Sequence, residues 1–208
     1  MARITGDFTR VRDVNGESTL ANLAADAHLA AGKKASQPAD FALTASSPNR
    51  GDLLYTKGSN AADADGLVLF GEQWNAHGYA NPVVVVTLTG RQIDQILEEQ
   101  WVAQSNGTIA FSPLAVSRNV NYAFDSSKAV GQRVEPENFM IDGKPLDPDR
   151  TYRVAALAYL IRGADGYPTF KGYTNPVRTV VDHWAFLSYL QDQEVVEPEV
   201  GRVSDINQ

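Results

Sequence analysis

Four side chains near the ends of predicted strands could together bind a nucleotide. Arg50 lies in a polar loop just after a short apolar strand, and Tyr79 lies in a turn just before another strand. Tyr159 ends a third strand, and Asp165 follows it in a turn. Two aromatic rings can sandwich a base, a guanidinium group can pair with phosphate, and a carboxylate can accept hydrogen bonds from ribose hydroxyls. Loops at strand ends often carry ligands, although aromatic residues at strand ends are also common in proteins that bind none.

Metal-dependent chemistry has weak support in this sequence. Asp26 and His28 form a D-x-H pair, but both lie in a predicted helix, where residues two apart point to different faces. The segment 61–72 has aspartates and a glycine at three positions of a calcium-binding loop, yet Ala61 stands at the first ligand position. We therefore expect a solvated loop there and no metal site in this chain.

Other catalytic signatures are also missing. The chain has no cysteine, which excludes disulfides, zinc-thiolate sites and thiol catalysis. It has no G-x-S-x-G sequence, no phosphate-binding glycine loop and no dinucleotide-binding fingerprint. These absences predict that the chain alone is not an enzyme.

Composition indicates an ordinary globular protein. The 208 residues are 43% hydrophobic and 21% charged, enough to bury a core without cross-links. The net charge of -7 argues against a nucleic-acid backbone or an anionic membrane as the partner, but not against a small phosphorylated ligand. No apolar stretch is long enough to span a bilayer. The N-terminal residues lack the apolar region of a signal peptide, so the chain is either cytoplasmic or part of a longer protein.

The predicted elements alternate irregularly between helices and strands, which favours an α+β fold with mixed sheets and about three main helices. Helices are expected from Ser18 to Ala31, from the Thr89/Gln92 capping box to about Trp101, and over 182–192 with Asp182 as the cap. Residues 46–66 read as loop. The expected strands are 39–45, 82–89, 118–125 and two strands within 138–161.

Four segments, in order, resemble the C-terminal domain of the 5'-nucleotidase / UDP-sugar hydrolase / 2',3'-cyclic-nucleotide phosphodiesterase family. The first is similar to the family's E-x-x-x-G-N-L-x-x-D-A helix and the second to its A-D-x-A-x-x-N/S-G-G-G-I-R loop. The third is similar to P-F-G-N-x-L-V-x-x-x-L-T-G-x-x-I and the fourth to Y-x-V-x-x-x-x-F-x-x-x-G-G-D-G-F/Y. The matching segments are GESTLANLAADAHLAA, ADFALTASSPNRGDL, HGYANPVVVVTLTGRQI and YRVAALAYLIRGADGYPTF. Each is weak alone, but the four in order cover nearly the whole chain.

The resemblance implies a substrate-binding domain over residues 1–208, taken from a longer exported phosphoesterase. By it, Tyr79 and Tyr159 sandwich the base, Asp165 holds the ribose and Arg50 contacts the nucleotide. Asn81 and Gly163, from the same motifs, join the candidate substrate-binding set. The resemblance places no cofactor on this domain and two divalent metals on a missing N-terminal metallophosphoesterase domain. An extracellular, periplasmic or cell-wall location is implied in the same way.

Departures from the family pattern concern the phosphate side of the expected site. Ser46, Ser47 and Pro48 replace three glycines, and proline removes an N–H and fixes φ, so this loop must differ in shape. Ala45 stands where the family often has Asn or Ser. A second family arginine, upstream of the first helix, falls on Val14 in this sequence, and Arg12 is near that position but off register.

Two functions therefore stay open. In the first, the domain binds a nucleotide while metals on another domain hydrolyse the phosphoester. In the second, the domain has lost its nucleotide and is a structural or binding module of another exported hydrolase, such as a nuclease. The retained aromatic and aspartate residues favour the first, and the altered loop favours the second.

Overall fold

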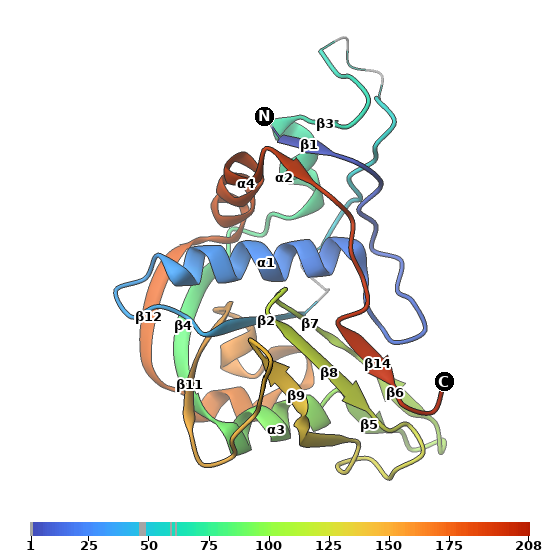
Figure 1. Cartoon of the computed structure of the whole chain (residues 1–208), viewed down its shortest axis with the longest axis vertical. Coiled ribbons are helices and arrows are strands. Elements are labelled where there is room, and N and C mark those ends of the chain that lie inside the picture. The colour runs from blue at the N-terminus through green and yellow to red at the C-terminus, as the bar shows by residue number, and fades with distance from the viewer. Residues whose placement is uncertain (1, 46–48, 59, 61) are drawn as a thin grey trace.

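A five-stranded mixed sheet in the order β12-β4-β11-β2-β7 forms the centre of the protein (Figure 1). The structure is a computed structural model that describes residues 2–45, 49–58, 60 and 62–208. β11 runs parallel to β2, and the other neighbouring pairs are antiparallel. The predicted α+β class with mixed sheets is confirmed. The strands of this sheet are β2 Phe41–Ala45, β4 Pro82–Thr89, β7 Leu114–Val116, β11 Thr151–Leu157 and β12 Thr174–Val181.

β4 is the best-predicted strand, with the bounds expected from its run of β-branched residues. Its side chains alternate between two buried layers. Val84, Val86 and Leu88 pack into the larger apolar cluster with the helix that follows, whereas Val83 and Val85 pack into the cluster on the opposite face. A strand buried on both faces reads as a continuous apolar run, as this one does.

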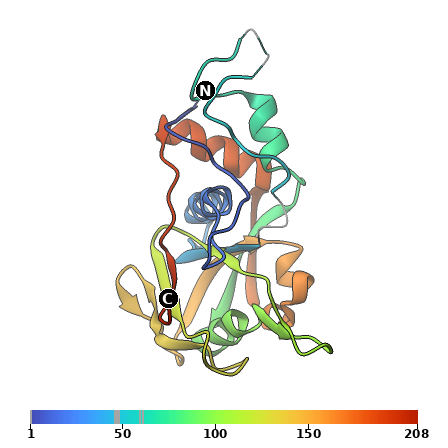
Figure 2. The same ribbon diagram turned by 90° about the vertical axis from the view of Figure 1, so that its right-hand side faces the viewer.

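Four α-helices occur in the described part of the chain, one more than the three expected. α1 begins after Ser18, whose Oγ accepts from the Ala21 amide, and α3 begins at the predicted capping box of Thr89 and Gln92. Figure 2 shows α1 end-on, between the sheet and α4. The helices are α1 Thr19–Lys33, α2 Phe70–Ala76, α3 Gly90–Glu98 and α4 Asp182–Gln193.

Three local predictions need correction. α2 was missed because it is a single short helix after a stretch rich in Asp and Gly. α3 ends at Glu98, so Trp101 begins strand β5 instead of lining the helix, although it is still buried. Val181, not Asp182, occupies the cap position of α4; the buried Asp182 carboxylate instead accepts from the amides of His183 (2.7 Å) and Tyr79 (3.2 Å).

Smaller sheets surround the central one. A four-stranded sheet has the order β10-β9-β8-β14 and a three-stranded sheet the order β13-β1-β3, while β5 and β6 form a hairpin. Short 3-10 turns at residues 160–162, 164–166 and 168–172 follow β11. The remaining strands are β1 Ala2–Ile4, β3 Leu67–Val68, β5 Trp101–Ala103, β6 Ile109–Phe111, β8 Val120–Phe124, β9 Val134–Ile141, β10 Lys144–Pro145, β13 Val195–Val196 and β14 Val203–Asp205.

A buried ion pair fastens the C-terminal segment to α1. The Arg202 guanidinium donates two parallel hydrogen bonds of 2.9 Å to Asp26, which also accepts from Arg118. The buried Glu17 carboxylate accepts from the backbone amides of 201–203 at 2.7–3.1 Å. Glu17, Asp26 and Arg202 are buried, and ion pairs together with backbone hydrogen bonds compensate their charges.

A second buried polar group lies on the other side of α1. His28 Nε2 is 3.2 Å from His77 Nε2, and His77 Nδ1 is 2.9 Å from Asn49 Oδ1. Burial lowers the pKa of His28 well below its usual range, and the neighbouring His77 lowers it further. Burial also lowers the pKa of His77, to about 4, with Asp182 opposing this shift and His183 adding to it. Both histidines are therefore neutral near pH 7.

Replacing Arg202 with Met should lower the free energy of unfolding by about 3 kcal/mol, because the buried Asp26 loses its bidentate partner and keeps only Arg118. Denaturation in urea at pH 7 measures the change. The matched control is Arg91→Met, which breaks the exposed Arg91–Asp149 pair (2.7 Å) and should cost less than about 1 kcal/mol. Equal losses of unfolding free energy in the two variants would contradict a stabilising role for the buried Arg202–Asp26 pair.

Stability should fall as the pH drops from about 6.5 towards 4. The unfolded chain takes up protons at His28 and His77 in this window, whereas the native state does not, so the stabilisation present above pH 6.5 is lost. Urea unfolding at pH 6.5 and pH 5 checks this. Between these two pH values, the free energy of unfolding of the unchanged protein should fall by about 1.5 kcal/mol more than that of a His28→Leu variant.

The comparison with His28→Leu also controls for an opposing group. Burial, together with the neighbouring Glu98, Glu135 and Glu137, raises the pKa of Asp94 to about 6, so protonation of Asp94 stabilises the native state as the pH falls. Its contribution is the same in both proteins and cancels in the difference. The same loss in both proteins would show that His28 is not held neutral.

Candidate ligand-binding site

The register of the central sheet brings the predicted site residues to one edge. β2 and β11 are parallel, with Ala42 opposite Ala155, so both end at this edge. β4 is antiparallel to β11, with Val83 opposite Leu157, so it begins there, and the Ala158 amide donates to the Pro82 carbonyl (2.8 Å). The segments after β2 and β11 and the turn before β4 are therefore neighbours. These three segments carry Arg50, Tyr79, Tyr159 and Asp165.

Arg50 and Tyr79 are in direct contact. The guanidinium carbon of Arg50 lies 4.8 Å from the centre of the Tyr79 ring, a cation–π arrangement. Backbone bonds hold the two segments together, since the Arg50 amide donates to the Ala76 carbonyl (2.9 Å) and Asn49 forms an antiparallel bridge with His77. Tyr79 is still 53% exposed, so it offers ring surface for stacking.

Tyr159 and Asp165 form the second contact of the set. The Tyr159 hydroxyl donates to Asp165 Oδ2 at 3.2 Å, across the 3-10 turns that follow β11. Asp165 has a φ of 56°, in the left-handed region that Asp tolerates better than most residues. The turn thus presents an exposed carboxylate beside a half-buried aromatic ring.

A hollow of about 620 Å³ adjoins this edge, and Asp165 is the member of the predicted set that lines it. Arg10, Arg12, Asn49 and Ala45 also line it, with Ser112 and Pro113. Arg10 is tied to the segment after β2 by bonds to Asp52 (2.8 Å) and to the Arg50 carbonyl (2.9 Å). The hollow therefore combines two guanidinium groups, an amide and a carboxylate.

The two arginines that line the hollow lie near the position of the second family arginine, but not at it. Val14, where the family pattern placed it, is 75% exposed and is not among the residues that line the hollow. Arg10 and Arg12 line it instead. Their alternate spacing could have indicated this, because residues two apart in an extended segment point to the same side.

The two additional candidates have structural roles near the site. Asn81 is half-buried, and its carbonyl accepts from the Asp182 amide at 2.8 Å, which joins the Tyr79 turn to α4. Gly163 has a φ of 81°, and a Cβ there would lie 2.5 Å from Lys171 Cε. Glycine is therefore required for the turn itself, and ligand contact by either residue stays a prediction. Ser46, Ser47 and Pro48 lie outside the described residues.

Tyr167, the other aromatic residue of this turn, is a core residue. It is 1% exposed, and its hydroxyl donates to the Ser112 carbonyl. Tyr167 therefore packs the turn, whereas Tyr159 is the tyrosine that contacts Asp165.

Among the described residues, no group of three or more His, Asp or Glu side chains could hold a metal ion. Asp26 and His28 diverge as expected, Asp26 towards Arg202 and His28 towards His77. In the loop 61–72, the Asp63 and Asp65 carboxylates accept from the amides of Gly58 and Lys57, and Ala61 lies outside the described residues.

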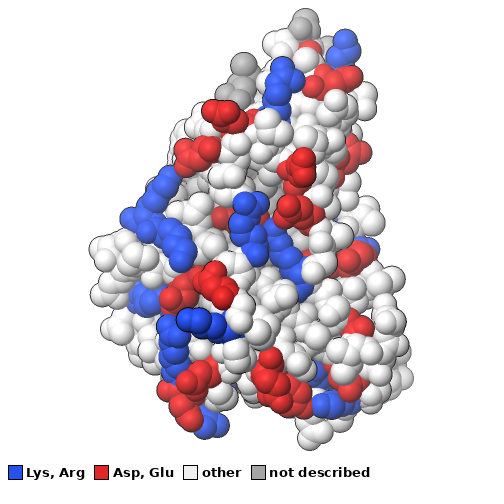
Figure 3. All heavy atoms as spheres, viewed as in Figure 1, with Lys and Arg blue, Asp and Glu red and all other residues white. Residues whose placement is uncertain are grey.

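Two further surface features bear on partners. Lys and Arg side chains are interspersed with Asp and Glu over the face shown in Figure 3, so that face is not uniformly basic.

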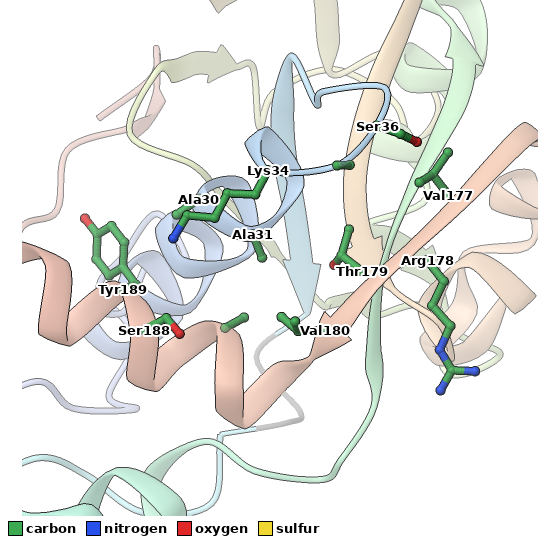
Figure 4. A pocket seen from close by; sticks show the side chains of 12 residues that line it. Ala30, Ala31, Lys34, Ser36, Val177, Arg178, Thr179, Val180, Ser188 and Tyr189 are labelled. Carbon is green, nitrogen blue, oxygen red and sulfur yellow. The ribbon is translucent and has the colours of Figure 1, made fainter.

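A second hollow, of about 440 Å³, lies between the end of α1, β12 and α4, and contains none of the predicted residues (Figure 4). No helix in the described ranges has the length and apolar character needed to cross a membrane.

Comparisons with known proteins place the chain in a family. A model of the family "5'-nucleotidase, C-terminal domain" matches residues 1–172. The chain is 28% identical over 178 residues to a cell wall protein of Listeria monocytogenes, and 30% identical over 192 residues to the trifunctional nucleotide phosphoesterase protein YfkN of Bacillus subtilis. These matches cover 86% and 91% of this chain.

A solved structure is similar over the whole chain. The 5'-nucleotidase precursor from Thermus thermophilus is 28% identical, with a TM-score of 0.78 and 100% of this chain covered. The NAD nucleotidase of Haemophilus influenzae, at 20% identity and a TM-score of 0.69 over 98% of this chain, has the same fold.

This chain spans only part of each relative: 22% of the Listeria protein, 12% of YfkN and 39% of the Thermus chain. The family match covers most of the chain, and the fold it implies is the fold observed. The chain belongs to the family of 5'-nucleotidase C-terminal domains.

Proposed function

We propose that this domain binds the substrate of a nucleotide phosphoesterase, holding the base and ribose while a separate domain hydrolyses the phosphoester. The observation that carries the proposal is the meeting of Arg50, Tyr79, Tyr159 and Asp165 at one sheet edge, beside a hollow lined by two arginines. Membership of the family supports the same function. The chemistry of each predicted side chain is suited to binding one part of a nucleotide.

The aromatic and acidic members of the set bind the base and the ribose. Tyr79 and Tyr159 stack on the base, and each stacked ring contributes roughly 1–3 kcal/mol in comparable sites. Asp165 accepts hydrogen bonds from ribose hydroxyls. The bond from the Tyr159 hydroxyl restrains the Asp165 carboxylate before the ligand arrives, so less conformational freedom is lost on binding.

The phosphate side uses Arg10, Arg12 and Arg50. Guanidinium groups match the geometry of phosphate oxygens. Arg10 also holds the Arg50 carbonyl, so the segment that carries Arg50 is braced by a second arginine. In this arrangement the domain orients the phosphate towards the catalytic domain without taking part in the reaction.

Hydrolysis is assigned to two divalent metals on an N-terminal metallophosphoesterase domain, where they activate water. The relatives are several times longer than this chain, which leaves length for such a domain. The name of the Listeria relative, a cell wall protein, supports an exported location for the whole protein.

A second candidate function has its own observation. Serines and a proline replace the family's three glycines at 46–48, which changes how closely backbone can approach a ligand. On this alternative, the domain no longer binds a nucleotide and is a structural module of another exported hydrolase, such as a nuclease.

Calorimetry with adenosine, AMP and UDP-glucose separates the two functions. The proposal expects binding of at least one of these ligands, weakened roughly tenfold or more by Tyr79→Ala and by Tyr159→Ala, because a stacked ring is lost. Tyr55→Ala is the matched control: this tyrosine is 42% exposed, does not line the hollow, and should leave the dissociation constant within about twofold. No binding across the panel would favour the structural module.

Thermal unfolding of Tyr159→Ala and of one further variant, Tyr167→Ala, separates loss of affinity from loss of stability. Tyr167→Ala should lower stability by about 3 kcal/mol or more, because it empties a buried site. Tyr159→Ala should cost less stability but more affinity, since its ring is only half-buried. The reverse pattern would show that the aromatic residues have been assigned to the wrong roles.

Turnover assays test whether hydrolysis belongs to another domain and not to this chain. The purified chain should not hydrolyse AMP or UDP-glucose above background with Mn²⁺, Mg²⁺, Zn²⁺ or Ca²⁺, because the activating metals are assigned to another domain. Release of phosphate is the measurement. Metal-dependent turnover that persists through purification and disappears with a chelator would overturn the proposal.

A further inference from the structure

Asp182 holds the turn that carries Tyr79 at both of its ends. The Tyr79 amide donates to Asp182 Oδ2 (3.2 Å), and the Asp182 amide donates to the Asn81 carbonyl (2.8 Å). The other carboxylate oxygen, Oδ1, accepts from the His183 amide at 2.7 Å. One residue at the start of α4 therefore closes a hydrogen-bonded ring around residues 79–81.

The middle residue of this turn has a strained backbone. Ala80 has a φ of 56°, in the left-handed region that residues with a Cβ rarely adopt. The family motif P-F-G-N has Gly at this position, where the same conformation carries no such strain. A strained backbone persists only where its surroundings hold it in place. The two bonds to Asp182, one on each side of Ala80, provide that restraint.

A carboxylate at this place is costly, so its retention needs an explanation. Asp182 is 0% exposed, and in the described ranges no Lys or Arg forms an ion pair with it. His183 Nδ1 lies 3.5 Å from Oδ1, and the N-terminus of α4 favours a negative charge. A neutral residue could begin this helix without burying a charge. The contact that a neutral apolar residue could not make is the one with the Tyr79 amide.

The direction of the Tyr79 ring depends on this backbone. The side chain is 53% exposed, so packing restrains it little. Its contact with Arg50 is a cation–π interaction at an exposed site, which is weak. The bond from the Tyr79 amide to a buried carboxylate is charge-assisted and is therefore the stronger restraint.

We propose that Asp182 is a positioning residue for base recognition, which fixes the backbone of residues 79–81 so that the Tyr79 ring is in its stacking position before the ligand binds. The inference rests on the proposed function. A preorganised ring loses less conformational freedom on binding. Asp182 thus strengthens binding of the base without touching the ligand.

Asp182→Asn tests the restraint with little change in side-chain size. Asparagine offers one oxygen where two backbone amides need an acceptor. Because the bond to His183 is the shorter one, the bond to Tyr79 should be lost. AMP should then bind about fivefold more weakly by calorimetry, since the ring must be ordered on binding.

A double-mutant cycle shows whether Asp182 acts through Tyr79. In a Tyr79→Ala background, Asp182→Asn should change the dissociation constant of AMP less than about twofold, because the ring that it positions is already absent. If the loss of affinity is the same in both backgrounds, Asp182 has only a structural role and the inference is wrong.

Asp205→Asn is the matched control. Asp205 is also buried and accepts from two backbone amides, those of Ser126 (3.2 Å) and Asn207 (3.1 Å), but it lies in β14. This variant should also lose stability in urea, yet leave AMP affinity within about twofold. An equal loss of AMP affinity in the Asp182 and Asp205 variants would show that affinity only follows stability, and would overturn the inference.

Amide hydrogen exchange, followed by NMR on the unchanged protein, needs no variant. Without ligand, the Tyr79 amide should exchange at least about tenfold more slowly than the Ala80 amide of the same turn. Protection of Tyr79 that appears only after AMP is added would overturn this inference alone, as would AMP binding that Tyr79→Ala weakens and Asp182→Asn does not. If the unchanged chain does not bind AMP, adenosine or UDP-glucose, the proposed function fails and this inference fails with it.

Discussion

The pairing of β4 with β11 is the constraint on which the candidate site depends. It runs in register from Thr151 opposite Thr89 to Leu157 opposite Val83, and it places the Tyr79 turn beside the Tyr159 turn. A slip of one residue would move every buried valine of β4 to the wrong face, so the two apolar layers also enforce this register. The loops can vary in sequence because their meeting point is set by the sheet.

Residues two apart on α1 give its two sides different kinds of buried polar contact. Asp26 is charged and is neutralised by Arg202 and Arg118, so that side joins segments through full ion pairs. His28 is neutral and joins His77 through a single shared proton. The ion pair fixes position strongly at the cost of desolvation, whereas the neutral histidine pair adds no charge to the interior. The D-x-H spacing thus has a structural explanation on both faces.

Local patterns were sufficient for much of the fold. The valine-rich run predicted the bounds of β4, and the side-chain caps Ser18 and Thr89 predicted the starts of α1 and α3, because these signals act within a few residues. The same local signals failed for α2, which is held by packing on α4. In the site, the four motif residues were proposed from the sequence and Arg12 was noted near the second family arginine, but Arg10 and the Asn49–His77 contact were not anticipated. Those depend on which distant segments meet, which periodicity and capping do not report.

The attachment of residues 201–203 to Glu17 and Asp26 also has a consequence for how the chain folds during synthesis. Arg202 leaves the ribosome 176 residues after Asp26, its partner in α1. Domains fold as units once their residues have been made, and contacts between residues far apart in sequence form slowly. Until residues 201–203 arrive, the carboxylates of Glu17 and Asp26 lack these partners, and that end of α1 stays solvated. The order of synthesis thus delays closure of this layer until every described residue that lines the hollow beside Asp165 has been made.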